Sequence, residues 1–114
     1  LDVVQNLPWM NTNPRFLEPN YGENIKATDA FRSLAADMGL RAAGLAIAWV
    51  LAKGDHVTTI PGTRSVAHFD ELVAGWQRGL AADEVAEVER VLPLGWAHGD
   101  RYSDDQWLGP ERYC

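Results

Sequence analysis

The segment His56-Val57-Thr58-Thr59-Ile60-Pro61-Gly62-Thr63-Arg64-Ser65 decides the fold of this chain. Its part from Val57 to Ile60 is rich in β-branched residues, which favour an extended strand, and the Pro-Gly pair ends that strand. A helical period begins at Val66, so a strand-to-helix junction is predicted. The free N–H groups at a helix start attract anions, which makes the junction a candidate anion site. A plain turn with Ser65 as the helix N-cap explains the same residues.

Four helices are predicted around this strand from the spacing of apolar residues, at 25–38, 42–53, 66–76 and 82–92. We expect Asn24 to cap the first helix and Gly39 to end it. The second helix is apolar on nearly all faces, so it is predicted to lie in the core. Gly44 within it indicates close packing or a tolerated weakness. Trp49 and Trp76 lie on apolar helical faces and are expected in the core.

The two ends of the chain lack a helical period. Residues 1–23 are rich in proline but carry aromatic side chains, which predicts an ordered loop rather than a linker. Residues 96–114 are predicted to form a tail that lies on another part of the protein. We therefore expect residues 1–114 to form a single segment, with a loop at 1–23, helices and one strand at 24–95, and the tail after them.

Composition limits the class of protein. A chain of 114 residues that is 46% hydrophobic and 23% charged is typical of one soluble globular domain. The net charge of −6 argues against a nucleic-acid or membrane partner, since both need a basic face. The single cysteine, Cys114, excludes an internal disulfide and fits the cytoplasm. No histidine stands at metal-ligand spacing with Asp104 and Asp105, so no metal site is predicted.

The predicted strand has no partner within the chain. Its N–H and C=O groups would be left unpaired unless another strand completes the ladder. That strand would come from a missing N-terminal part or from a second copy of the chain.

Several motifs together resemble one enzyme family. The run Leu45-Ala46-Ile47-Ala48-Trp49-Val50-Leu51-Ala52, followed by Gly54-Asp55, Ile60-Pro61-Gly62-Thr63-Arg64, Val66, His68 and Glu71, is similar to the last βα unit of the aldo-keto reductases. Pro14-Arg15-Phe16 and Glu23-Asn24 resemble a segment before the penultimate barrel helix, and Gly99-Asp100-Arg101-Tyr102 resembles the end of one bacterial branch. The resemblance spans the whole chain but only the final third of such an enzyme. It implies an α/β fold, the mostly helical C-terminal portion of a (β/α)8 barrel, incomplete as a barrel.

The resemblance implies NADPH as the cofactor. On the family pattern, the nucleotide-binding residues are Gly62, Thr63, Arg64, Ser65 and His68. Thr63 and Arg64 would hold the 2′-phosphate, which suits a planar guanidinium fork. A surface role explains His68 equally well. Leu72 stands where the family usually has an asparagine that touches adenine, and leucine offers no hydrogen bond. A truncated, free-standing relative would need no cofactor.

The family's catalytic tyrosine, lysine, aspartate and histidine belong to early strands, and this chain has no matching positions. We therefore expect no hydride transfer by the chain alone. The local candidates for chemistry are His98, Asp100, Arg101 and Tyr102, which ion pairs and turn hydrogen bonds explain as well. Trp9, Trp96 and Trp107 could line a pocket for a flat apolar ligand, or simply pack against the barrel.

Three functions are compatible with these observations. The chain could be the cofactor- and substrate-contacting part of an NADPH-dependent aldo-keto reductase. Alternatively, a free-standing truncated homologue, dimeric or larger, could catalyse a cyclisation or isomerisation of a small apolar or aromatic metabolite. A binding or scaffold module without chemistry is the third. In the first two, the ligand is a small molecule.

Overall fold

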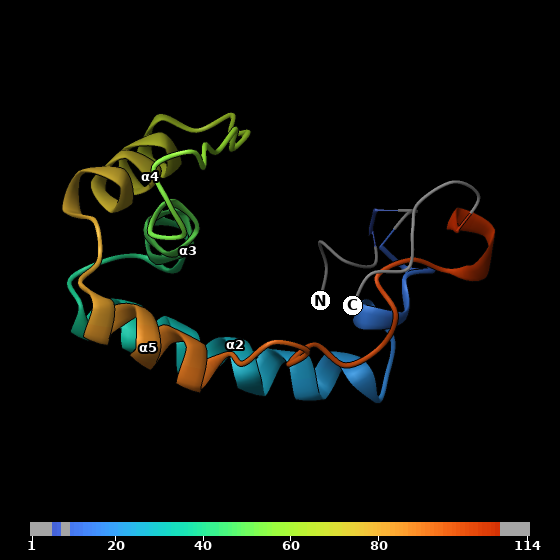
Figure 1. Ribbon diagram of the computed structural model, residues 1–114. Helices are drawn as coiled ribbons and strands as arrows, with labels where there is room; N and C mark the ends of the chain where they lie inside the picture. The colour runs from blue at the N-terminus through green and yellow to red at the C-terminus, as the bar shows by residue number, and fades with distance from the viewer. Residues whose placement is uncertain (1–5, 8–9, 108–114) are drawn as a thin grey trace. The chain divides into compact units, whose positions relative to one another are not determined.

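The computed structural model describes residues 6–7 and 10–107 (Figure 1). Its helices are α2 (Asn20–Asp37), α3 (Ala42–Leu51), α4 (Val66–Arg78) and α5 (Ala82–Val91), with short 3-10 helices η1 (Pro14–Phe16) and η2 (Asp104–Gln106). Two compact units are distinguished. We call residues 29–93 the helical unit, and the described residues of 1–28 and 94–114 the terminal unit.

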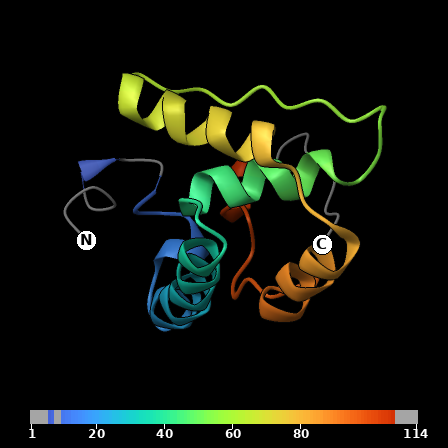
Figure 2. The ribbon, with the colours of Figure 1, turned by 90° about the vertical axis from the view of Figure 1, so that its left-hand side faces the viewer.

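Within the helical unit, α3 is the central element. It lies between α4 on one side and, on the other, α5 with the last turns of α2 (Figures 1 and 2). Leu45 is fully buried there and shares the core with Ala35, Leu40 and Val88. The half-buried side chains that pack against this core are Phe31, Leu34, Met38, Trp49 and Leu80. Only one face of α3 is fully buried, so the prediction of burial on nearly all faces was too broad.

A contact between two glycines joins α3 to α4. Both Gly44 and Gly75 are buried. A Cβ on Gly44 would lie 2.6 Å from the carbonyl oxygen of Glu71, and one on Gly75 would collide with the Gly44 carbonyl. The two backbones can approach this closely only because neither position has a side chain. Gly44 therefore marks close packing, the first of the two explanations predicted for it.

The strand predicted over Val57–Ile60 is not formed. The described residues include no β-strand, and Val57 to Thr63 have no regular secondary structure. A strand is defined by its ladder of hydrogen bonds, and no other segment of residues 6–7 and 10–107 pairs with this one. Ile60 consequently stays 96% exposed.

Three large apolar side chains of α4 are also exposed. Val66, Phe69 and Trp76 are 79%, 56% and 64% exposed, so the prediction of Trp76 in the core was wrong. The helix contacts α3 through its Glu71 and Gly75 side, which lies next to the apolar stripe and not on it. Glycine lets the backbones meet, and this close contact determines which face is buried.

An ion pair links α4 to α5 within the helical unit. Arg78 donates from Nη2 to Glu84 Oε1 at 2.5 Å and from Nη1 to Glu84 Oε2 at 3.1 Å. Glu84 Oε2 also accepts from the Ala81 N–H at 2.9 Å. The Arg78 hydrogen bond and, next, the Ala81 N–H lower the pKa of Glu84 to about 2. This carboxylate thus joins the end of one helix to the start of the next.

Asparagine side chains hold the terminal unit together. Asn24, predicted as an N-cap, instead lies inside α2 and is buried, because the helix begins at Asn20 within the predicted loop. Its Nδ2 donates to the carbonyls of Arg15 (3.0 Å) and His98 (2.9 Å), and its Oδ1 accepts from the His98 N–H at 2.8 Å. Buried Asn13 donates likewise to the Arg101 carbonyl. The chain after α5 is thereby fastened beside the start of α2.

No single described helix is long and apolar enough to span a membrane, and only α2 and α3 taken together, with an 84° bend between them, meet the length and composition required.

Replacing Gly75 by alanine should destabilise the helical unit. Its methyl group would force α3 and α4 apart, and overpacking of this kind costs about 1–3 kcal/mol. Gly22→Ala is the matched control, because a Cβ there meets only the flexible end of Glu18 at 3.3 Å. That variant should gain up to about 1 kcal/mol from helix propensity. Urea unfolding followed by circular dichroism measures both, and an equally stable Gly75→Ala protein would contradict the glycine contact.

Glu84→Gln should lower the melting temperature near neutral pH and leave it unchanged in acid. Because the folded-state pKa of Glu84 is about 2 against an ordinary 4.5, the carboxylate stabilises the fold fully above pH 4.5. That contribution disappears as the pH falls toward 2. Thermal melts of the two proteins should therefore converge over this range. Glu87→Gln, which removes an exposed pair with Arg90 inside α5, should lower the melting temperature less than Glu84→Gln near neutral pH.

Asn24→Ala should loosen the tail without melting α2. Alanine is a better helix former than asparagine, but it leaves the Arg15 and His98 carbonyls and the His98 N–H unpaired. The His98 amide should then exchange its hydrogen at least about tenfold faster, since each lost bond is worth about 1 kcal/mol or more. Asn11→Ala, an exposed position in the same unit, should leave this rate unchanged. An unaltered His98 rate in Asn24→Ala would contradict the fastening.

Candidate functional site

Charge pairing singles out three arginines. Six Lys and Arg side chains of the described residues form ion pairs with carboxylates, namely Lys26, Arg32, Arg41, Lys53, Arg78 and Arg90. Arg15, Arg64 and Arg101 form none with any described residue. In a chain of net charge −6, cations left unpaired are available for an anionic ligand. Each of the three lines an open depression.

The first depression, which we call the junction depression, lies at the start of α4. It measures about 680 Å³ and is lined by Gly62, Thr63, Arg64, Ser65 and His68, all five residues predicted to bind the nucleotide. These residues come together because they are nearly consecutive where the chain enters the helix. Four of the five lining residues are exposed and Ser65 is half-buried, so a ligand would lie across the surface and not inside the protein.

Hydrogen bonds between side-chain hydroxyl groups and backbone N–H groups hold the junction in shape. Ser65 Oγ accepts from the His68 N–H at 3.4 Å, which confirms Ser65 as the N-cap of α4. Thr63 Oγ1 accepts from the Ser65 N–H at 3.2 Å. The N–H groups of Val66 and Ala67, in the first turn, have no acceptor within the helix. Arg64, between the two hydroxyl residues, is thus placed beside free backbone donors.

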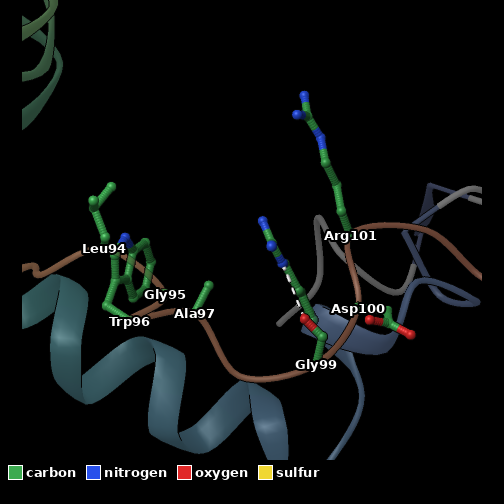
Figure 3. A pocket seen from close by; sticks show the side chains of 8 residues that line it. Leu94, Gly95, Trp96, Ala97, Gly99, Asp100 and Arg101 are labelled. Atoms are coloured by element: carbon green, nitrogen blue, oxygen red, sulfur yellow. Dashed lines mark hydrogen bonds between the residues drawn. The ribbon is translucent and has the colours of Figure 1, made fainter. Parts of the chain in front are cut away.

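The second depression, the tail depression, lies in the terminal unit (Figure 3). Its volume is about 850 Å³, and its lining consists of Arg15, Leu94, Gly95, Trp96, Ala97, Gly99, Asp100 and Arg101. Arg15 donates from Nε to the Gly99 carbonyl at 3.2 Å. Figure 3 shows Leu94 and Trp96 side by side at one end, and Arg101 extending away from Asp100 at the other. The depression combines an apolar wall with two guanidinium groups.

The four candidate catalytic residues do not all face this space. Asp100 and Arg101 line the tail depression, whereas His98 and Tyr102 are not part of its lining. The Tyr102 ring packs edge-on against Trp107, with centroids 5.2 Å apart, and the Arg101 guanidinium lies 5.5 Å from the Tyr102 centroid. No ion pair joins these four to one another within the described chain. Neighbours along an extended segment point in different directions, so they do not converge on one substrate atom.

The tryptophans predicted as a pocket are likewise separated. Trp96 lines the tail depression, Trp107 packs on Tyr102 instead, and Trp9 lies outside the described residues. Sequence reasoning missed Arg15 and Leu94 as site residues. No local pattern could have revealed them, because Arg15 meets Gly99 only through folding of the terminal unit. Among the described residues, no three His, Cys, Asp or Glu side chains are grouped to hold a metal ion.

Comparison with known proteins places the chain in a family. The model of the "Aldo/keto reductase family" matches residues 3–93. A soybean (Glycine max) protein, "Probable aldo-keto reductase 1", is 31% identical over 103 residues, which cover 88% of this chain and 30% of that protein. The chain thus spans less than a third of this relative's length. No solved structure matches it. This chain belongs to the aldo/keto reductase family, of whose barrel fold it forms a partial, mostly helical piece.

Proposed function

We propose that the junction depression binds the 2′-phosphate of NADPH, and that this chain serves a carbonyl-reducing aldo-keto reductase in that role. The observation that carries the proposal is Arg64, a guanidinium without a carboxylate partner among the described residues, at the N-terminal end of α4. A nicotinamide dinucleotide supplies the hydride when it is bound. The residues of this chain would hold its phosphate end.

The donors around Arg64 suit a dianionic phosphate. A guanidinium offers paired, planar N–H groups that match two phosphate oxygens. The free N–H groups of Val66 and Ala67 and the positive end of the α4 dipole add to the attraction. His68 lines the same depression one turn into the helix. These features together favour an anion of charge −2 at this place.

The adenine side of the proposed site is less polar than is usual in the family. Leu72, one turn beyond His68, replaces the expected asparagine and is half-buried in α4. Adenine would therefore meet an apolar side chain and lose one hydrogen bond. We expect the 2′-phosphate to contribute a correspondingly larger share of the affinity.

The chemical step is proposed for the whole enzyme and not for these residues. The chain has no positions that match the family's catalytic tyrosine, lysine, aspartate and histidine. Its role in reduction is to retain the nucleotide so that the nicotinamide stays beside a substrate carbonyl. Retention of this kind lowers the entropy cost of the reaction.

Arg64→Ala should weaken NADPH about tenfold or more and leave NADH nearly unchanged, because only NADPH carries the 2′-phosphate. Calorimetric titration of 2′,5′-ADP and 5′-AMP isolates the same difference without the nicotinamide. Arg90→Ala is the control, since Arg90 pairs with Glu87 on α5. Equal losses for the two nucleotides, or a wild-type chain that binds neither, would contradict the proposal.

A further inference from the structure

We propose that the tail depression is a second ligand site, for a small organic monoanion with a flat apolar body, such as an arylcarboxylate. This inference does not depend on NADPH binding at Arg64. It rests on the charges, the apolar wall and the rigid backbone of the terminal unit.

The charges in the depression indicate a negatively charged ligand. Arg15 and Arg101 form no ion pair with any described residue, although the chain has more acidic than basic side chains. Arg15 uses Nε for the Gly99 carbonyl, and neither of its terminal nitrogens donates to another described residue. A guanidinium that keeps both terminal nitrogens free has the geometry that binds a carboxylate.

The charged side chains that line the depression also favour a ligand with a single negative charge. Asp100 lines the same depression and forms no ion pair with the described residues, so two guanidinium groups and one carboxylate leave a net charge of +1. One carboxylate neutralises this charge completely, whereas a dianionic phosphate would leave the occupied depression with a net charge of −1. Here the tail depression differs from the junction depression, where no acidic side chain is part of the lining.

The apolar side chains at one end of the depression favour a ligand with an aromatic ring. The Leu94 side chain is 98% exposed, and the half-buried Trp96 indole lies beside it (Figure 3). Covering these two surfaces with an aromatic ring would remove apolar area from water, and stacking on an indole adds to that gain. The volume of about 850 Å³ is ample for a bicyclic ring.

The backbone that carries these groups is held in place before any ligand arrives. Asn13 binds the Arg101 carbonyl, and Asn24 binds both backbone groups of His98. Gly99 adopts φ +83°, and a Cβ there would lie 2.6 Å from Asn20 Nδ2. A preorganised site loses less entropy on binding than a flexible one. The tail and η1 therefore present the Arg101 and Arg15 guanidinium groups from backbone that is already held in place.

The test is a titration of the full chain with 2-naphthoate and with neutral 2-naphthamide, followed by calorimetry and tryptophan fluorescence. We expect naphthoate to bind at least about tenfold more tightly than the amide, since the carboxylate makes charge-assisted hydrogen bonds. Added salt should weaken naphthoate and leave the amide unaffected.

Two variants separate the contributions. Arg101→Gln should weaken naphthoate about tenfold and reduce its preference over the amide to the part that Arg15 supplies, with folding checked by circular dichroism. Trp96→Leu should weaken both compounds together. Arg32→Gln is the control, because Arg32 pairs with Asp29 in the helical unit, and it should change neither affinity. Absence of naphthoate binding, equal affinity for the amide, or an Arg101→Gln protein that binds like the wild type would overturn the proposal.

Discussion

The close approach of Gly44 to Gly75 is the constraint on which the helical unit depends. It brings the backbones of α3 and α4 together without side chains between them. The orientation of α4 follows from this contact, and the start of α4 carries Ser65 and Arg64. The exposed junction at the start of α4 thus depends on the buried contact that Gly75, nearer the end of α4, makes with Gly44 of α3. The phosphate site we propose depends on packing as much as on its own residues.

Ion pairing explains why the two depressions stand out chemically. Most cations of the described chain are neutralised by a nearby carboxylate, as Arg78 is by Glu84 and Lys53 by Glu89. Isolated exposed pairs add little stability, but they do remove a cation from competition for a ligand. Arg64 and the two arginines of the tail depression have no carboxylate partner among the described residues, and we propose a different anion for each depression from the groups around it. The proposed phosphate at the junction would be favoured by backbone N–H groups, whereas Asp100 leaves the tail depression with a net charge that a single negative charge would balance.

Local patterns predicted the helices well because helix formation depends on neighbours within four residues. The bounds of α3, α4 and α5 differ from the predicted ones by two residues at most, and the helix ending before Gly39 has that glycine at φ +71°. The sequence predicted Asn24 as an N-cap because asparagine is common at that position, and nothing nearby indicated that it would lie inside α2. Its partners, Arg15 and His98, lie 9 and 74 residues away, beyond the reach of any local pattern.

The candidate sites show the same division. The junction could be found from the sequence because its residues are consecutive at a helix start, and their resemblance to the family motif indicated the ligand. The tail depression could not, because Arg15 and Gly99 meet only in the folded chain.

The sequence by itself determined the family, the four helices and the N-cap at Ser65, since all of these are carried by neighbouring residues. Tertiary structure alone decided which surfaces are buried. Val66, Phe69 and Trp76 of α4 are exposed because Gly75 turns another face of the helix toward α3. Val57 to Ile60 form no strand because no segment of the described residues pairs with them. Burial and ladder pairing depend on partners distant in the chain, and local propensity does not specify those partners.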